Sequence, residues 1–377
     1  MKIAVFFNLP SGGAKRVLYG QIKRLSKKHF VDIYTLSGAN HEFCDLRKLV
    51  KNYYIEKISA ESFIDYIHYV YIKLPKLEEK IAQKIDKKKY DAVLVHPDFY
   101  TQAPYILRYL KTPSLYYCHE VRREFYENIP RISKFFTYYA TLPLRYPIKF
   151  IDRYNIKKAN KILVNSQFSQ KLVKKYYGLE SEVNYPAIDN QKFKKILIKK
   201  ENFILSVGGF NLLKGHDFII KSLALIPEKI RPKYVIVGNG GEDKKYLLEL
   251  AQNKKVKLEL HENVSDSELV SWYNRTKLFV YAARNEPFGL APLEALSYHL
   301  PIIAVEEGGV TEILKGIKLA QLVGRNEIEM SNKIIQMLKT NFTPEDFEKT
   351  NQILHKRLNW EKSVHELDNH LQSLCQK

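Results

Sequence analysis

Short apolar runs alternate with amphipathic segments along most of the chain. Residues 17–25 have helical spacing, and Ser166 is a suitable N-cap for a helix that Gly178 would end. Continuous apolar strands separated by such helices predict a parallel sheet with both faces covered. In the first half, the apolar runs span residues 2–7, 31–36, 91–95, 114–118 and 161–165.

The alternation stops between residues 185 and 202 and then begins again. Residues 185–189 read Tyr-Pro-Ala-Ile-Asp, and the charged stretch 192–200 follows them, which is typical of a linker. Residues 265–268, Ser-Asp-Ser-Glu, form a capping box that predicts the start of a helix. In the second half, the apolar runs span residues 203–207, 233–237, 256–260, 278–281, 301–305 and 319–323.

The two rounds of alternation predict two α/β domains, which suits a chain of 377 residues with a hydrophobic fraction of 45%. We expect an N-terminal domain over residues 1–190, a linker over 191–202 and a C-terminal domain over 203–359. Residues 360–377 have helical spacing and no strand follows them, so we expect a last helix there.

The net charge of +20 is concentrated in the first half. Residues 1–190 contain 33 Lys or Arg and 18 Asp or Glu, a net +15, whereas residues 201–377 contain 23 of each sign. A general bias toward lysine would not favour one half. The basic half therefore predicts an anionic partner: membrane phospholipid, a lipid phosphate or nucleic acid.

Other features of the sequence predict a cytoplasmic protein. No run of about 18 apolar residues is present, and no signal peptide is visible at the start. Cys44, Cys118 and Cys375 are far apart and lack metal-ligand or redox spacing, so we interpret them as reduced thiols.

The most informative segment is residues 285–296, which read Asn-Glu-Pro-Phe-Gly-Leu-Ala-Pro-Leu-Glu-Ala-Leu. It follows an apolar run and opens a helix, and helix N-termini suit phosphate and other anions. Gly289 removes side-chain bulk where a ligand could approach the backbone. Glu286 precedes the helix and Glu294 lies inside it, so the two could reach different parts of one hydroxyl-rich ligand such as a sugar nucleotide. The alternative is a surface helix with two unrelated glutamates.

This segment resembles the E-x7-E motif of retaining GT-B glycosyltransferases of family 4. Four further segments resemble the same family. The resemblance implies two Rossmann-like, doubly wound parallel-sheet domains that face a cleft, with the last helix crossing back onto the first domain. These further segments are residues 8–14, 115–126, 207–215, and 235–240 with 261–264.

The resemblance also implies roles for individual residues. Glu286 would hold the hydroxyls of the donor sugar, Glu294 the ribose, and Lys214 the donor diphosphate. The family usually has an arginine where this chain has Gly209, and Arg284 is a candidate to replace it. The catalytic set would be His119, Glu286 and Lys214. The remaining donor-binding positions would be Gly12, Gly13, Gly209, Gly238, Glu262, Asn263, Val264, Phe288, Gly289 and Leu290.

His119 belongs to a segment, Tyr-Tyr-Cys-His-Glu-Val-Arg-Arg, that resembles a subset of the family whose members are commonly mannosyltransferases. In that subset the histidine would face the transferred sugar. Taken alone, His119 could equally be a structural histidine. No Asp-x-Asp motif follows an apolar strand, so we expect no metal and no cofactor, with GDP-mannose or a UDP-sugar as the donor substrate.

Two segments of the first half, residues 63–73 and 131–149, are both basic and aromatic. Such composition suits an anionic membrane surface, although the aromatic residues could instead belong to the core. We expect these segments to lie on the acceptor side of the enzyme. The acceptor-side and membrane-side residues that we expect are Arg122, Arg123, Arg131, Lys134, Phe135, Phe136 and Arg145.

The sequence thus predicts a retaining, metal-independent glycosyltransferase that acts on a glycan or lipid-linked acceptor at the inner face of the cell membrane. One alternative is a GT-B enzyme of another reaction, such as a sugar-nucleotide epimerase or a nucleic-acid glucosyltransferase. Another is a noncatalytic nucleic-acid-binding protein. The chain lacks a basic recognition helix and an RNA-binding aromatic signature, so we expect no nucleic-acid partner.

Overall fold

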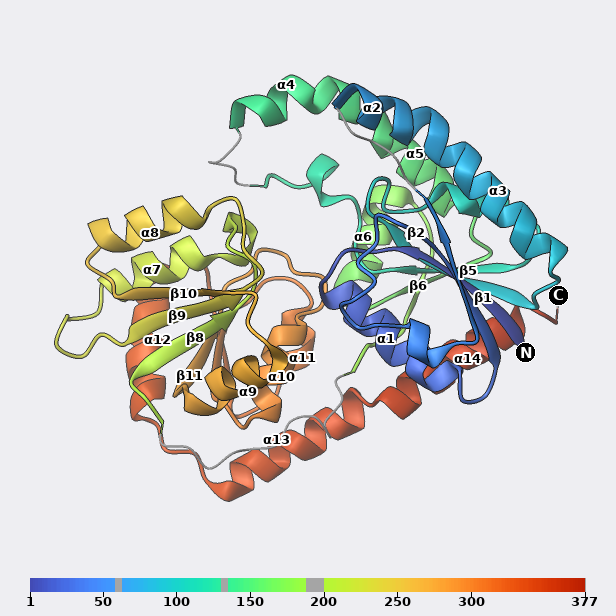
Figure 1. The fold of residues 1–377 in the computed structure, drawn as a ribbon. Helices are drawn as coiled ribbons and strands as arrows, with labels where there is room; N and C mark the ends of the chain where they lie inside the picture. Colours follow the sequence, from blue (N-terminus) through green and yellow to red (C-terminus); the bar gives the residue numbers. More distant parts are fainter. Residues whose placement is uncertain (58–62, 130–134, 188–199, 377) are drawn as a thin grey trace. The chain divides into compact units, whose positions relative to one another are not determined.

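The structure is a computed structural model that describes residues 1–57, 63–129, 135–187 and 200–376, without the side chains of 63–65 and 135–137. The chain divides into two compact units (Figure 1). The first comprises Met1–Asn128, Phe136–Ala187 and Leu358–Lys377, and the second comprises Ile129–Phe135 and Ile188–Arg357. Most of the predicted linker, residues 191–202, lies outside the described residues.

The first unit is built on a seven-stranded parallel sheet of order β3-β2-β1-β4-β5-β6-β7. The first strand therefore lies between the second and the fourth, as in doubly wound sheets. Its strands are β1 (Lys2–Asn8), β2 (Phe30–Leu36), β3 (Asn52–Glu56), β4 (Ala92–Asp98), β5 (Ser114–Cys118), β6 (Lys161–Val164) and β7 (Glu182–Val183).

The first sheet is buried on both faces, as its continuous apolar strands predict. Ala4 and Phe6 of β1 pack into one core cluster. Ile3, Val5 and Phe7 point to the opposite face and are also fully buried. The helices of this unit are α1 (Gly13–Leu25), α2 (Phe63–His68), α3 (Leu74–Lys87), α4 (Phe135–Arg145), α5 (Pro147–Ile156), α6 (Gln167–Tyr177) and α14 (Trp360–Ser373), with shorter turns at η1 (Arg47–Leu49), η2 (Tyr69–Lys73), η3 (Tyr105–Arg108) and η4 (Arg123–Phe125).

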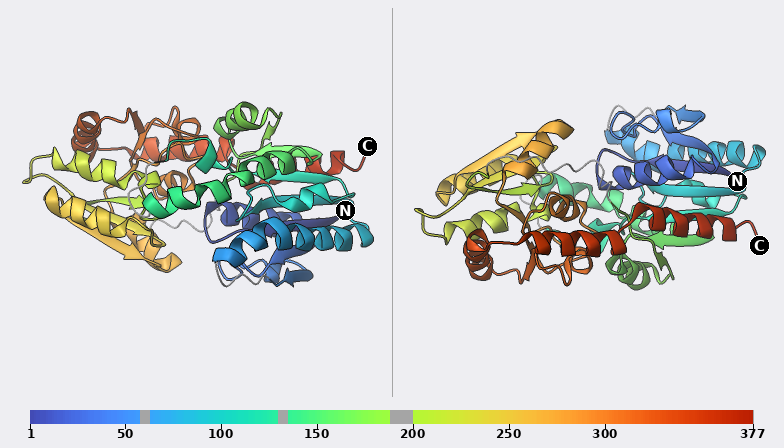
Figure 2. Two further views of the ribbon diagram at one scale, coloured as in Figure 1. Left: turned by 90° about the horizontal axis from the view of Figure 1, so that it is seen from above. Right: turned by 90° about the horizontal axis from the view of Figure 1, so that it is seen from below.

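The last helix packs on the first unit, which confirms the expected return of the chain. α14 lies against α1 (Figures 1 and 2), where Gly20 provides the space for Trp360. A Cβ atom at Gly20 would lie 2.3 Å from the Trp360 ring. Asn184 donates a hydrogen bond of 2.8 Å to the Ser363 carbonyl, which holds the same helix beside β7.

The second unit repeats the same strand order in a six-stranded parallel sheet, β10-β9-β8-β11-β12-β13. The strands are β8 (Phe203–Val207), β9 (Lys233–Gly238), β10 (Leu258–Glu262), β11 (Leu278–Tyr281), β12 (Ile302–Val305) and β13 (Ala320–Val323). The helices are the short η6 (Leu212–Lys214), α7 (His216–Ala224), α8 (Lys244–Asn253), α9 (Asp266–Arg275), α10 (Leu290–Ser297), α11 (Val310–Leu314), α12 (Glu327–Lys339) and α13 (Pro344–Arg357).

Two predicted helix caps are confirmed. The Ser166 hydroxyl accepts a hydrogen bond of 2.9 Å from the Ser169 N–H at the start of α6, and Gly178 ends the helix with a φ of 72°. Ser265 and Glu268 form the complete capping box of α9. Of the helices in the described ranges, none combines the length and the apolar character needed to cross a membrane.

Candidate active site

The carboxyl edge of the second sheet is the natural place for a ligand in this unit. β8 pairs with β9 on one side and with β11 on the other, so the loops that follow β8 and β11 diverge from neighbouring strand ends. In open α/β sheets, ligands bind at this kind of switch point. The two loops carry the predicted residues Lys214 and Glu286.

Glycines allow the loops at this edge to pack backbone against backbone. A Cβ atom at Gly215 would lie 2.0 Å from the Ala282 carbonyl oxygen, so a larger residue would push the β8 and β11 loops apart. At Gly238 the same atom would lie 2.1 Å from the Gly208 carbonyl oxygen. Gly215 also has a φ of 69°, which favours glycine. These glycines therefore hold the loops at a close, defined separation, which suits the binding of a small ligand.

Lys214 and Glu286 meet across the switch point. The Lys214 Nζ lies 2.8 Å from Glu286 Oε2, and 28% and 25% of the two side chains are exposed. The Lys214 stem lies beside Gly208, where a Cβ atom would be 3.3 Å from it. The structure thus brings two of the three predicted catalytic residues into one ion pair. An ammonium and a carboxylate arranged in this way can bind a phosphate and a sugar hydroxyl respectively.

Glu294 lies within α10 and is held by a tyrosine that the sequence did not suggest. Its side chain is buried, and Oε2 accepts a hydrogen bond of 2.9 Å from the Tyr273 hydroxyl of α9. The Tyr273 ring stacks on Tyr298 with centroids 4.9 Å apart. This support fixes the direction of the carboxylate. Tyr273 precedes Glu294 by 21 residues, and no local sequence pattern connects them.

The other predicted positions of the second unit lie on neighbouring loops. Gly289 is the N-cap of α10 with a φ of 102°, Phe288 is buried in the protein and Leu290 is half-buried. Glu262 and Asn263 are exposed at the end of β10, and Val264 is half-buried. The Asn263 N–H donates to the Gly238 carbonyl over 3.1 Å, which joins the β9 and β10 ends.

Gly209 occupies a restricted position. A Cβ atom there would lie 3.1 Å from the Asn211 amide nitrogen and 3.3 Å from the Gly240 carbonyl oxygen. The Arg284 N–H donates a hydrogen bond of 2.8 Å to the Leu213 carbonyl, so Arg284 is joined to the segment that carries Lys214. This placement keeps Arg284 a candidate for the role of the missing arginine.

The first unit has a second switch point, between β1 and β4, which carries the predicted Gly12 and Gly13. Gly12 is the N-cap of α1 with a φ of 146°, and a Cβ atom there would meet no atom within 4 Å. At the adjacent strand ends, the Asn8 side-chain amide donates to Asp98 over 2.7 Å. A helix N-terminus beside open space can accept an anion.

His119 lies at the end of β5 and is buried. Its Nε2 lies 3.0 Å from His96 Nδ1, and Asn165 donates to its carbonyl oxygen over 2.9 Å. Burial lowers the pKa of His119 to about 3, so the imidazole is neutral at physiological pH. A neutral imidazole can donate or accept a hydrogen bond but carries no charge to a substrate.

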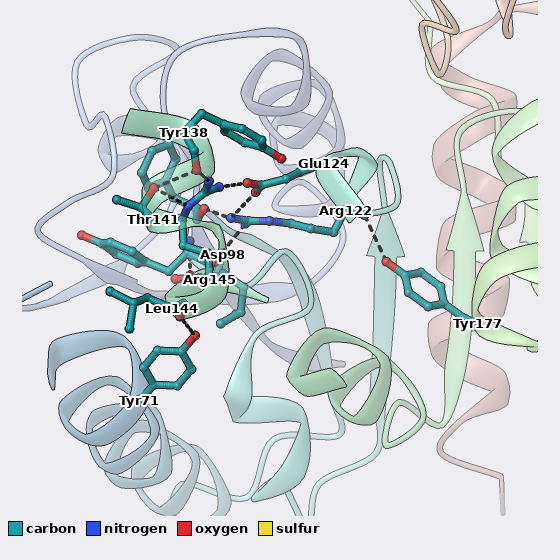
Figure 3. Close-up of polar contacts among 12 residues, drawn as sticks. Tyr71, Asp98, Arg122, Glu124, Tyr138, Thr141, Leu144, Arg145 and Tyr177 are labelled. Atoms are coloured by element: carbon teal, nitrogen blue, oxygen red, sulfur yellow. Dashed lines mark hydrogen bonds and ion pairs between the residues drawn. The ribbon is translucent and has the colours of Figure 1, made fainter. Parts of the chain in front are cut away.

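The predicted arginines on the acceptor side are held in ion pairs (Figure 3). Arg145 and Arg122 converge on Glu124; Arg122 lies 3.6 Å from the carboxylate and also donates to the Tyr100 carbonyl over 2.9 Å. Arg123 pairs with Glu127 at 2.8 Å. These side chains are 10–15% exposed, and the two glutamates neutralise two of the three arginine charges. Arg131, Lys134, and the side chains of Phe135 and Phe136 lie outside the described residues.

An exposed aromatic surface runs from Tyr146, the N-cap of α5, along that helix, and only its beginning lies within the predicted segment 131–149. Tyr146, Phe150 and Tyr154 are 45%, 60% and 51% exposed and recur every four residues, so they lie on one face. Arg153 and Lys157 are exposed beside them. The spacing was visible in the sequence, but periodicity alone does not tell which face of a helix is buried. We name Tyr146, Phe150, Arg153, Tyr154 and Lys157 the α5 ridge.

Two family models match consecutive parts of the chain. The family described as Glycosyltransferase Family 4 matches residues 11–192, and the family described as Glycosyl transferases group 1 matches residues 187–354. The alpha-1,3/1,6-mannosyltransferase ALG2 of Saccharomyces cerevisiae is 24% identical over 377 residues, which cover 85% of this chain and 71% of that protein.

Solved structures share the fold at low sequence identity. Sucrose-phosphate synthase from Thermosynechococcus elongatus superposes with a TM-score of 0.77 at 14% identity, covering 99% of each chain. HepE from Anabaena, in complex with UDP and glucose, has a TM-score of 0.71 at 16% identity and covers 99% of this chain and 100% of its own. This chain belongs to glycosyltransferase family 4 and is a retaining GT-B hexosyltransferase that transfers a sugar from a nucleotide sugar.

Proposed function

We propose that this enzyme transfers a mannose-like hexose, without a metal ion, from a nucleotide-diphosphate sugar to a glycan or lipid-linked acceptor at an anionic membrane surface. The observation that carries the donor half of this proposal is the Lys214–Glu286 pair, 2.8 Å apart at the switch point of the second sheet. The α5 ridge supports the membrane half.

The pair suggests how the donor is held and activated. Lys214 binds the diphosphate and stabilises the charge that grows as the bond between the anomeric carbon and the phosphate oxygen breaks. Glu286 binds hydroxyls of the transferred sugar. The acceptor oxygen attacks on the same face and forms the new glycosidic bond, while its proton passes to the departing phosphate oxygen. The lysine and the N-terminus of α10 supply the positive charge that a metal ion would otherwise provide.

The choice of a mannose-like sugar rests on two separate observations. The segment around His119 resembles the mannosyltransferase subset, and the ALG2 relative is described as a mannosyltransferase. HepE, by contrast, was solved with UDP and glucose, which makes a UDP-sugar the competing donor. The donor test below therefore includes both classes.

The α5 ridge suits the boundary between lipid and water. Ile148 and Ile156 hold the opposite face of α5 in the core, so the aromatic face is presented outward by a fixed helix. Aromatic rings favour the membrane interface, and the basic side chains beside them are attracted to anionic headgroups. Since Arg122, Arg123 and Arg145 are paired with glutamates, we assign the membrane contact to the ridge rather than to these arginines.

The donor half is tested by measuring sugar transfer from GDP-mannose and from UDP-glucose to a polyprenyl-diphosphate-linked saccharide, in vesicles and in buffer containing EDTA. We expect transfer from GDP-mannose with the anomeric configuration retained. Transfer from UDP-glucose alone would refute the mannose assignment. Loss of all activity in EDTA, with recovery on adding Mn²⁺, would refute metal independence.

The membrane half is tested by co-sedimentation with phosphatidylcholine vesicles that do or do not contain phosphatidylglycerol. Burying one Phe side chain contributes roughly 1.5–3 kcal/mol, so Phe150→Ser should reduce partitioning by about 10- to 150-fold. Ile328→Ser is the matched control, because Ile328 is 63% exposed in the second unit. Equal sedimentation with both vesicle types, or equal effects of the two substitutions, would exclude the ridge as the membrane contact.

A further inference from the structure

Lys15 is a fully buried lysine whose ammonium group has no hydrogen-bond partner. It lies in the first turn of α1, two positions after Gly13. Its Nζ lies 3.8 Å from the centre of the Phe7 ring, a cation–π contact that offsets only part of the lost hydration. Buried charges in proteins are normally paired with an opposite charge. Neither the fold nor the donor site described above explains this one.

Further buried polar atoms on the same face of the sheet lack partners. Thr35 of β2 is in register with Phe7, so its side chain lies on the same face, and its Oγ1 has no hydrogen-bond partner. His96 of β4 contributes Nε2, which is also unpartnered, while its Nδ1 contacts His119. The register of β4 against β1 shifts at this point, between Phe6 and Asn8. Such irregularities are common beside functional sites.

Asp45 has an electrostatic effect on Lys15 but does not form an ion pair with it. The main influence on Lys15 is burial, which lowers the pKa of its ammonium to about 8, with smaller opposing effects from Cys44 and Asp45. Asp45 is bound to Arg47, with Oδ1 2.9 Å from the Arg47 Nε. Burial lowers the pKa of His96, with smaller contributions from His119 and Lys15. The cluster therefore has an excess of donors and positive charge.

We propose that Lys15, Thr35 and His96, together with the free N–H groups at the start of α1, form an anion site of the first unit that takes a phosphate group of the acceptor. This inference rests on the proposed function, in which the acceptor is a lipid-linked glycan. Lys15 supplies the charge, while Thr35 and neutral His96 supply hydrogen bonds. Gly13 is exposed and open space lies beside Gly12, so an anion can reach the N–H groups at the start of α1.

The test measures thermal stability of the full chain in the presence of saturating GDP or UDP, so that the nucleotide site of the second unit is already occupied. Inorganic pyrophosphate and inorganic phosphate are then added. We expect a further rise in Tm for the wild-type protein. Lys15→Met should weaken this second response by about 10- to 150-fold in apparent Kd, because a charged hydrogen bond is lost. Lys15→Arg keeps the charge and should retain part of the response.

Two readouts separate this site from a structural role for Lys15. Without added phosphate, Lys15→Met should be at least as stable as the wild-type protein, because it removes a buried, unpartnered charge. Thr35→Val, which preserves shape, should likewise keep or raise the basal Tm and reduce the phosphate response. Lys214→Met should reduce the nucleotide response and leave the phosphate response in place.

The outcomes distinguish the two proposals. A nucleotide response without any phosphate response overturns the anion site and leaves the proposed donor function intact. A phosphate response that survives in both Lys15→Met and Thr35→Val also overturns it. Absence of the nucleotide response, with the phosphate response present, contradicts the donor assignment instead.

Discussion

Because Glu286 is paired with Lys214, substitution of Glu286 should change the affinities for the nucleoside diphosphate and for the sugar nucleotide in opposite directions. Glu286→Gln keeps the shape of the side chain and removes its charge, and Lys214→Met keeps most of the lysine stem. The two side chains are about a quarter exposed, so their attraction contributes about 0–1 kcal/mol to stability. Both variants should therefore fold, and their effects on ligand affinity can be measured directly.

The expected magnitudes follow from the geometry of the pair. A diphosphate that binds Lys214 comes within roughly 6 Å of the Glu286 carboxylate, where repulsion costs about 1 kcal/mol at this partial exposure. Glu286→Gln should therefore tighten binding of GDP or UDP by about 3- to 10-fold. The same change removes charged hydrogen bonds to the sugar, which contribute roughly 1.5–3 kcal/mol, so the sugar nucleotide should bind more weakly. Lys214→Met should weaken both ligands by about 10- to 150-fold.

Calorimetric titration with the nucleoside, the nucleoside diphosphate and the sugar nucleotide would measure these terms separately. The pair Lys233–Glu259 is a matched control, since its atoms lie 2.9 Å apart and the side chains are 31% and 42% exposed. Lys233 begins β9, at the opposite edge of the same sheet, so Lys233→Met and Glu259→Gln should leave every affinity unchanged. If Glu286→Gln weakens the diphosphate and the sugar nucleotide equally, or if Lys214→Met weakens the plain nucleoside as strongly, the assigned roles are wrong.

Three further predictions concern the rest of the protein. Glu294→Ala should weaken nucleotide binding by about 10- to 150-fold, and Tyr273→Phe should weaken it by a smaller factor. Tyr234 is another buried tyrosine of this unit, and Tyr234→Phe should change the stability but not the nucleotide affinity. Transfer activity should survive exhaustive chelation, and a requirement for added Mn²⁺ or Mg²⁺ would contradict the proposed charge neutralisation by Lys214. Burial lowers the pKa of His216 to about 3, so folded His216 stays neutral while the unfolded residue gains a proton below about pH 6.5. Lowering the pH from 7 to 5 should therefore reduce the free energy of unfolding by about 2 kcal/mol more in the wild-type protein than in His216→Gln. Urea unfolding of both proteins at the two pH values would measure this difference.

The sequence predicted most strands because those strands are buried on both faces. β1, β4 and β5 each contain a run of four or more consecutive apolar residues whose side chains are buried, so these runs stand out from the flanking helices. β3 was missed, because it lies at the sheet edge and its residues, Asn-Tyr-Tyr-Ile-Glu, are half-buried or exposed. β7, also missed, contains only two residues. Burial on one side leaves too weak a pattern to mark a strand.

The residues of the candidate site that belong to a sequence motif could be predicted, whereas contacts between residues distant in the sequence could not. Glu286 and Lys214 were expected from their loops, although their separation of 2.8 Å depends on close packing that begins at Gly215. Tyr273 could not be foreseen as the partner of Glu294, because the contact arises only when α9 and α10 fold together. Counting arginines also overestimated the exposed charge of the first unit, since the pairing of Arg145 with Glu124 appears only in three dimensions.

The two units share a strand order but use charge in different ways, and this difference bears on their roles. Residues 201–357 of the second unit contain 21 Lys or Arg and 20 Asp or Glu, so they are almost neutral, and the candidate site contains one compact ion pair at the strand ends. A local pair of this kind acts over a few ångströms and is suited to a small ligand of fixed shape. The first unit carries most of the excess positive charge, but Arg122, Arg123 and Arg145 are little exposed and share two glutamates. We therefore attribute the attraction to exposed lysines such as Lys157 and to the buried Lys15. Exposed charges are screened beyond about 8 Å at physiological salt, which suits recruitment to a surface, whereas a buried charge is screened far less and suits recognition of one phosphate. The same excess of lysine can therefore serve both the approach to an anionic surface and the selection of an anionic acceptor.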